Sequence, residues 1–278
     1  VSARIAMLLG ERTFQFSPVE LLTIHRRLFE GVFEHAGRIR PYNISKREWV
    51  LKGDSVIYAA CDSIKDTLEY DFYTEKQFSY EGLSLQESVK HLAKFTSDIW
   101  QIHPFCEGNT RTTAVFVIKY MKTFGLEVSN DVFAEHSWYF RNALVRANYN
   151  NLKNGIHATT EYLELFFSNL LLNTNYELKN RYIHVDYEST LETGDFQSEM
   201  KNVLKGKNFT LNFTLEELAI LRLIAEDPAI TQKEIAVKIG KSDRTVKNKM
   251  AILQDKQYIR RMNGKRNGRW EILVELPS

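Results

Sequence analysis

The chain has 278 residues, of which 44% are hydrophobic and 26% are charged, and its formal net charge is +2. This composition is typical of a globular protein with one or two domains, and the small net charge indicates no particular partner. No run of about eighteen apolar residues occurs, so we expect no membrane span, and the first residues show no signal-peptide pattern. The two cysteines, Cys61 and Cys106, make no disulfide framework, so we expect a cytoplasmic protein.

The first clear helix signal is Ser17-Pro18, a serine cap followed by proline at the first helical position. Apolar residues then recur at helical spacing from Leu21 to Phe33. We expect Gly37 to end this helix.

A short hairpin is predicted next. Glu48 to Leu51 and Val56 to Ala59 flank Lys52-Gly53-Asp54-Ser55, which has the composition of a turn. Its exposed edge can pair with an extended peptide, because unpaired N–H and C=O groups are available there. The alternative is an ordinary two-strand elaboration of the fold.

Two helices are predicted to flank a short loop near the middle of the chain. Ser84-Leu85-Gln86-Glu87 has the form of a capping box, and apolar residues follow at helical spacing up to Ile102. Pro104 should end this helix, which places His103 at its C-terminal end. A second, mostly buried helix should start between Asn109 and Thr112.

The loop between these helices combines residue types that suit phosphate chemistry. The first N–H groups of a helix are unpaired and positively polarised, and Gly108 permits close approach of a ligand to the backbone. Arg111 and Asn109 can donate to phosphate oxygens, and Glu107 can supply an oxygen ligand for Mg²⁺. His103 can take a proton from an attacking hydroxyl. The loop therefore predicts nucleotidyl or phosphoryl transfer.

These residues carry a family resemblance. The run His103-Pro104-Phe105-x-Glu107-Gly108-Asn109-x-Arg111 resembles the signature of the Fic family, His-Pro-Phe-x-(Asp/Glu)-Gly-Asn-Gly-Arg-x-x-Arg. The resemblance implies a mainly α-helical core with a small β-hairpin flap, and transfer of AMP from ATP to a Ser, Thr or Tyr hydroxyl of a target protein. It also implies that His103 is the base, that Glu107 holds Mg²⁺, and that Gly108, Asn109 and Arg111 bind the nucleotide phosphates.

The chain departs from the family pattern at two positions. Thr110 stands where the family usually has glycine, although its hydroxyl can donate to phosphate, and Ala114 stands where the second arginine is expected. Two alternatives therefore stay open. One is a phosphotransferase, and the other is a DNA-binding regulator whose Fic-like core binds a nucleotide or peptide without turnover.

The resemblance extends to both sides of the loop. In Fic proteins the hairpin is the flap that docks the target, which here would use Trp49, Val50, Val56, Ile57 and Tyr58. Helices are predicted for 135–148 and 160–172, and the first resembles the segment that lines the adenine side of the nucleotide site. Tyr139 and Asn148 are the residues carried over from it.

An inhibitory helix is not expected. Many Fic proteins carry a (Ser/Thr)-x-x-x-Glu-(Gly/Asn) motif whose glutamate pairs with the second arginine. Residues 2–7 resemble that motif with Ala6 at the glutamate position, and Thr160 to Glu164 is a looser match. Since Ala114 also removes the arginine, we expect this form of inhibition to be absent.

A second unit follows a polar segment. We divide the chain into a catalytic domain with an N-terminal helix (1–172), a linker (173–212) with one short helix near 197–204, and a winged helix-turn-helix domain (213–278). The last contains helices near 215–224, 231–239 and 242–254, then strands at 258–262 and 269–274 around a turn. We also leave open that the protein forms a homodimer.

The winged helix resemblance implies DNA binding. Residues 231–270 hold twelve lysines or arginines against three acidic residues, a formal charge of +9. Such a charge favours binding to nucleic acid phosphates. The candidate contacts are Arg244, Thr245, Lys247 and Asn248 on the recognition helix and Lys265, Arg266 and Arg269 on the wing.

Overall fold

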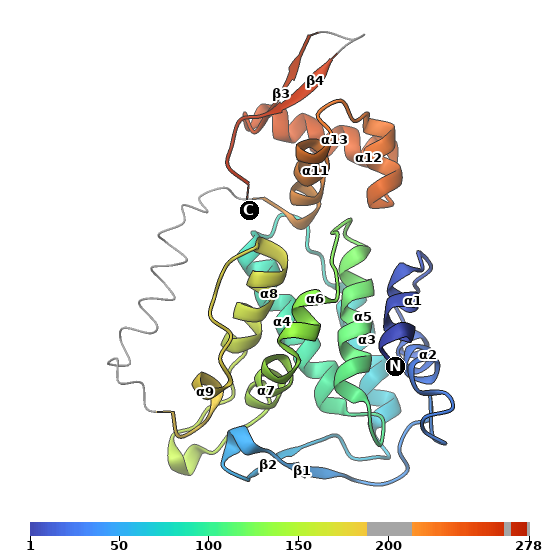
Figure 1. The fold of residues 1–278 in the computed structure, drawn as a ribbon, viewed down its shortest axis with the longest axis vertical. Helices are drawn as coiled ribbons and strands as arrows, with labels where there is room; N and C mark the ends of the chain where they lie inside the picture. The colour runs from blue at the N-terminus through green and yellow to red at the C-terminus, as the bar shows by residue number, and fades with distance from the viewer. Residues whose placement is uncertain (188–212, 264–267, 277–278) are drawn as a thin grey trace.

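The computed structural model describes residues 1–187, 213–263 and 268–276. In these residues the chain is mainly helical, with two small antiparallel sheets of two strands each, as predicted. Figure 1 shows a helical core with one hairpin at one end and a smaller helical unit at the other. None of the helices described has the length and apolar character needed to cross a membrane.

The N-terminal helices pack on the outside of the core. Helix α1 covers Ser2–Gly10 and α2 covers Pro18–Phe29, with the Ser17 side chain accepting a hydrogen bond from the Glu20 N–H as expected of a cap. The prediction that Gly37 ends α2 is wrong. The helix stops at Phe29, and Gly31 adopts the left-handed backbone conformation two residues later. The apolar spacing of the following residues disguised that earlier stop.

The hairpin, which we call the flap (residues 45–57), has a different first arm from the one predicted. Strand β1 is Ser45–Arg47 and pairs with β2, Ser55–Ile57, so that Ser45 lies opposite Ile57. Residues Trp49–Leu51 form the 3-10 helix η1 instead of a strand. Val50 and Leu51 are neighbours and are both buried, whereas successive side chains of a strand point to opposite faces, so a hairpin strand with one face in solvent would expose one of them.

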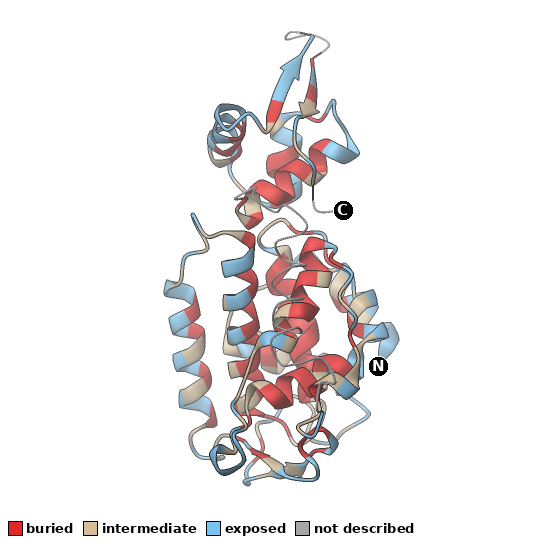
Figure 2. Cartoon of the chain, turned by 90° about the vertical axis from the view of Figure 1, so that its left-hand side faces the viewer, coloured by how far each residue is buried: buried red, intermediate tan, exposed pale blue. Residues whose placement is uncertain are grey.

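The centre of the core is a pair of helices joined by the loop of interest. Helix α4 is Leu85–Ile102 with the predicted capping box at Ser84, and α5 is Asn109–Lys122. Helix α5 is buried along most of its length, and Figure 2 shows buried residues concentrated on the central helices. The surrounding elements are α3 (Ile64–Gln77), α6 (Asp131–Glu135), α7 (Ser137–Ala147), η2 (Leu152–Asn154), α8 (Glu161–Leu172) and α9 (Asn180–Ile183).

The C-terminal unit has the predicted order of elements. Its helices are α11 (Leu215–Glu226), α12 (Gln232–Ile239) and α13 (Asp243–Asp255), and its strands are β3 (Ile259–Met262) and β4 (Arg269–Ile272). The short helix predicted near 197–204 lies outside the described residues.

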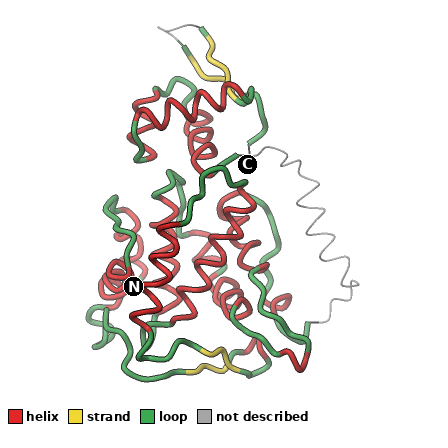
Figure 3. The backbone as a smooth tube through the Cα atoms, turned by 180° about the vertical axis from the view of Figure 1, so that it is seen from behind, coloured by secondary structure: helices red, strands yellow, loops and turns green. Residues whose placement is uncertain are grey.

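This unit rests on the end of the core opposite the flap (Figure 3). The Arg222 guanidinium donates to the Leu171 carbonyl at 2.8 Å. The backbone of Gly125 lies so close to Ile239 that a Cβ placed there would be 2.6 Å from it. The two units therefore share a packed contact far from the loop.

Candidate active site

The loop between α4 and α5 is held by its own polar groups. His103 caps α4 in the left-handed conformation, with φ at 50°, which is uncommon for a residue other than glycine and often marks functional sites. The Asn109 carboxamide oxygen accepts from the Phe105 N–H at 2.9 Å, and its amide nitrogen donates to the Phe105 carbonyl at 2.7 Å. We expected Asn109 to donate to phosphate. In this structure its side chain closes the loop instead.

Gly108 brings this loop against α2. Its φ is 82°, and a Cβ at this position would lie 2.5 Å from the Phe29 ring. Both the backbone conformation and the close contact require glycine here. Gly108 therefore sets how tightly the loop sits on the core.

The start of α5 leaves backbone donors free. No side chain caps this helix, and the N–H groups of residues 109–111 have no acceptor among the residues that the structure describes. Such N–H groups, together with the helix dipole, attract anions.

The His103 ring is nearly buried and neutral. Its exposed fraction is 3%, and the ring stacks on Tyr58 with centroids 3.9 Å apart. Nδ1 lies 3.3 Å from the Trp100 carbonyl, which can only accept, so the proton belongs on Nδ1 and Nε2 carries a lone pair. Burial, and after it the charge of Lys46, lowers the pKa of His103 to about 3. At neutral pH the ring can therefore accept a proton at Nε2.

A hollow of about 170 Å³, which we call the loop pocket, opens beside these groups. This volume is below the range of about 300–1,000 Å³ that is typical of pockets for drug-sized ligands, so it suits part of a nucleotide, such as its phosphates. It is lined by Lys46, His103, Glu107, Gly108, Asn109, Thr110, Arg111 and Arg141. Six of these eight residues were predicted from the sequence.

Arg111 and Thr110 present donors to the loop pocket. The Arg111 guanidinium lies over the Phe29 ring at 4.9 Å and pairs with no acidic side chain among the described residues. The Thr110 hydroxyl oxygen accepts from the Trp100 indole N–H at 2.9 Å. Its own hydrogen is then available for a ligand.

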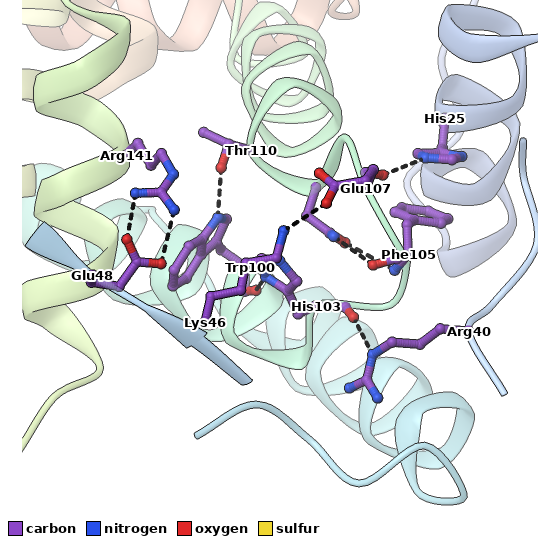
Figure 4. A network of polar contacts seen from close by, with 11 residues as sticks. His25, Arg40, Lys46, Glu48, Trp100, His103, Phe105, Glu107, Thr110 and Arg141 are labelled. Atoms are coloured by element: carbon purple, nitrogen blue, oxygen red, sulfur yellow. Dashed lines mark hydrogen bonds and ion pairs between the residues drawn. The ribbon is translucent and has the colours of Figure 1, made fainter. Parts of the chain in front are cut away.

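Glu107 is paired across the loop pocket with Lys46 of β1 (Figure 4). Nζ of Lys46 lies 3.2 Å from Oε1 of Glu107, whose side chain is 58% exposed. The described residues contain no group of three or more His, Cys, Asp or Glu that could hold a metal by themselves. Mg²⁺ commonly needs only one or two carboxylates plus the phosphates of a bound nucleotide, so a single accessible Glu107 fits such an ion.

Arg141 reaches the loop pocket from α7. It forms two hydrogen bonds, 2.6 and 2.8 Å long, to the carboxylate of Glu48, which is 2% exposed. A buried carboxylate needs such a partner, so this pair fixes the flap against α7. Lys46 and Arg141 were both missed from the sequence, because neither belongs to the loop motif.

Two other residues missed as site supports hold the loop from behind. Arg40, which is 1% exposed, donates to the carbonyls of His103, Ile102, Tyr42 and Ala59. His25 donates through Nε2 to the Glu107 carbonyl at 2.9 Å, while its Nδ1 accepts from the Gly37 N–H. The ring of His25 stacks on Phe105 with centroids 3.7 Å apart. Arg40 thereby joins the base of the flap to the end of α4.

The structure places two predicted nucleotide residues away from the loop pocket. Tyr139 is 2% exposed within the helical core. The amide of Asn148 is taken up by the Ser97 hydroxyl at 2.8 Å and the Leu144 carbonyl at 3.0 Å. Neither residue lines the pocket, because Tyr139 faces the core and Asn148, directly after α7, is bonded to Ser97 of α4.

The predicted flap residues divide by exposure. Trp49 and Ile57 are 60% and 82% exposed, whereas Val50, Val56 and Tyr58 are buried. Only the first two side chains are available to a partner, and Tyr58 instead supports the His103 ring.

Only some of the predicted DNA-contacting residues are exposed in the described part of the chain. Arg244, Lys247 and Asn248 are exposed on α13, and Arg269 is exposed on β4. The Thr245 hydroxyl is bonded to the Ser242 hydroxyl at 2.8 Å. Lys265 and Arg266 lie outside the described residues. Part of the basic charge is used internally, since Lys241 and Lys249 both pair with Glu216.

Comparisons with known proteins identify both units. Residues 15–121, which include the loop, match the model of the Fic/DOC family, and residues 217–260 match the model described as winged helix-turn-helix DNA-binding. The chain contains a Fic domain and a winged helix-turn-helix domain. Both resemblances seen in the sequence are confirmed.

Proteins of Bartonella are among the relatives of this chain. A protein adenylyltransferase of Bartonella henselae is 24% identical over 198 residues, which are 66% of this chain and 36% of that protein. This chain thus corresponds to about a third of the length of that relative. The structure of BepC from Bartonella tribocorum, with bound AMPPNP, is 22% identical with a TM-score of 0.50, and the match covers 61% of this chain and 81% of that one. At this identity the likeness shows a shared fold.

Proposed function

We propose that this protein is an adenylyltransferase that moves AMP from ATP onto a Ser, Thr or Tyr hydroxyl of a target protein. The observation that carries the proposal is the neutral His103 ring, with a free Nε2, lining the same pocket as an uncapped helix start. Support comes from the related protein adenylyltransferase of Bartonella henselae and from the AMPPNP bound to BepC.

In this mechanism the start of α5 and Arg111 hold the phosphates. Nε2 of His103 accepts the proton of the target hydroxyl as its oxygen forms a bond to the α-phosphorus. The bond from that phosphorus to the bridging oxygen breaks, and pyrophosphate leaves. Glu107 would hold Mg²⁺, which neutralises phosphate charge when bound. The negative nucleotide also favours the imidazolium that forms, which offsets the low pKa of His103 in the empty site.

The flap offers the target an extended edge. Strands β1 and β2 pair only with each other among the described residues, so each keeps one outer edge unpaired. A target segment that pairs with this edge would bring its hydroxyl toward the loop pocket, which Lys46 of β1 lines.

The winged helix is proposed to bind DNA. The exposed side chains of Arg244, Lys247 and Asn248 follow one face of α13, and that helix begins at the Ser242 cap. This is the arrangement of a recognition helix with basic residues near its N-terminal end.

The test is transfer of label from ATP to proteins of a lysate. ATP labelled at the α or at the γ phosphate is incubated with wild type, His103→Ala and His157→Ala, the last being an exposed histidine outside the pocket. We expect label from the α position only, lost in His103→Ala and kept in His157→Ala. Retention of γ label would instead establish phosphotransfer. No label with either ATP would favour the regulator without turnover, for which the missing arginine at Ala114 is the motivating observation.

A further inference from the structure

Lys46 and Glu107 meet across the loop pocket from separate elements. Lys46 lies on β1 of the flap, and Glu107 lies in the loop before α5, 61 residues later in the chain. Their side chains are 30% and 58% exposed, and both line the pocket. Figure 4 shows the Lys46 side chain reaching toward Glu107.

Lys46 is held less firmly than the other two cations of the loop pocket. Arg141 is fixed by two hydrogen bonds to the buried Glu48, so moving it would leave a buried charge unpaired. Arg111 rests on the Phe29 ring. Lys46 is joined to a partly exposed carboxylate by a single contact of 3.2 Å, which is a weak and exchangeable interaction.

The partner of Lys46 is also the carboxylate that suits a metal ion. A divalent cation on Glu107 would repel the ammonium group, because two positive charges would then share one carboxylate. The phosphates of a nucleotide in the same pocket offer the displaced ammonium new acceptors. Ala114, a buried alanine, stands where the Fic signature carries its second arginine, so this chain has no arginine at that position to contact a phosphate.

We propose that Lys46 is a nucleotide-contacting residue supplied by the flap. It neutralises Glu107 in the empty site, and its ammonium group moves to the phosphate oxygens when Glu107 takes Mg²⁺. This inference rests on the proposed function, because it requires the loop pocket to bind a metal-complexed nucleoside triphosphate. It also makes the position of β1 dependent on nucleotide, since Lys46 is part of that strand.

The test compares ATP binding by Lys46→Gln with binding by Arg47→Gln. Arg47 is the neighbouring, exposed residue of β1, and successive side chains of a strand point to opposite faces. Both variants lose one positive charge from the same strand. Calorimetry at a series of Mg²⁺ concentrations gives the Kd for ATP and the Mg²⁺ concentration at half of the full effect.

We expect Lys46→Gln to raise the Kd for ATP at saturating Mg²⁺ about tenfold, as for loss of a hydrogen bond from a charged group. The half-effective Mg²⁺ concentration should fall about threefold, because Glu107 loses its competing cation. These changes have opposite signs, which a merely distorted pocket would not produce. Lys46→Arg should restore most of the ATP affinity, and Arg47→Gln should match wild type.

Other results would overturn the inference. If wild type binds ATP and Lys46→Gln behaves like Arg47→Gln, Lys46 has no part in nucleotide binding, while the proposed function stands. If Lys46→Gln weakens both ATP and Mg²⁺, or Lys46→Arg restores nothing, the side chain acts only on the shape of the flap. If wild type binds no ATP at any Mg²⁺ concentration, the proposed function and this inference fall together.

Discussion

Helices α5 and α13 both begin with basic residues suited to phosphate, but their first turns are built differently. Helix α13 is capped by the Ser242 side chain, which accepts from the Thr245 N–H, and its basic residues Arg244 and Lys247 are exposed. Helix α5 has no side-chain cap, and its first N–H groups face a pocket. A helix start that binds one phosphate group through its backbone must leave its first N–H groups unpaired. A helix that binds the many phosphates of DNA through its side chains can have these N–H groups capped.

The surroundings of the two helices differ in the same way. The start of α5 is fixed from behind by buried polar groups, including Arg40 and His25. Helix α13 presents one face to solvent with no such support. Changes around α5 should therefore be costly and specific, and changes on α13 should be small and graded.

The largest expected effect is on stability at Arg40. Arg40→Met should lower the free energy of unfolding by about 3–5 kcal/mol, because it leaves four carbonyl oxygens without their donor. Denaturant unfolding measures this loss. Arg244→Met on exposed α13 is the matched control and should stay within about 0.5 kcal/mol of wild type. Similar losses in both variants would contradict the support assigned to Arg40.

The next largest effect is expected on transfer activity at Gly108. Gly108→Ala should reduce transfer activity at least about 100-fold, since the new Cβ meets the Phe29 ring and displaces the loop. Gly240→Ala, at the end of α12, has a similar positive φ but no atom within 4 Å of the Cβ. It should cost only about 1–2 kcal/mol of stability and leave activity intact. Steady-state rates of both variants measure the contrast, and an active Gly108→Ala protein would mean that the loop tolerates displacement.

The buried histidines should make stability depend on pH. Burial lowers the pKa of His103 to about 3 and that of His25 to about 4, whereas unfolded histidine titrates near 6.5. Below about pH 6.5 the unfolded chain therefore binds more protons than the folded one, and stability is lost as pH falls toward 4.

Substituting His103 isolates its contribution to the pH dependence of stability. Between pH 7 and pH 5 the loss of unfolding free energy should be about 2 kcal/mol smaller in His103→Gln than in wild type. Denaturant unfolding of both proteins is measured at both pH values. Burial raises the pKa of Asp71 to about 6, so Asp71 adds stability as the pH falls, opposite to the histidines. This contribution is the same in both proteins and cancels in their difference. Parallel pH profiles would mean that folding does not lower the pKa of His103.

The smallest effect is expected on α13. Lys247→Ala should weaken DNA binding only a few-fold, equally for all sequences, and lower the slope of log affinity against log salt by about 1. Titration of a labelled duplex at several salt concentrations measures both. An equal loss of ATP affinity in this variant would contradict the assignment of nucleotide binding to α5 and DNA binding to α13.

The sequence predicts local features of this protein better than its long-range ones. The caps at Ser17, Ser84 and Ser242 were readable because each capping side chain accepts from a backbone N–H only three residues later. The loop was readable because six of the pocket residues are nearly contiguous. The register of the flap was missed because the burial of Val50 and Leu51 depends on the core around them.

The missed site residues have a common cause. Lys46, Arg141 and Arg40 each reach the loop from elements distant in the chain, and no spacing rule links them to it. Tyr139 was carried over to the site from the family resemblance, but a one-residue shift on a helix turns a side chain by about 100°, which is enough to bury it.

The state of the His103 ring tests the central claim most directly. Nitrogen NMR of histidine-labelled protein, assigned with His103→Gln, reports the tautomer and the pKa with and without Mg²⁺ and ATP. We predict a neutral ring protonated at Nδ1 with a pKa below 5 in the free protein, and a rise in that pKa when ATP binds. A ring that titrates near 6.5, or whose pKa ignores ATP, would show that His103 does not face a bound triphosphate.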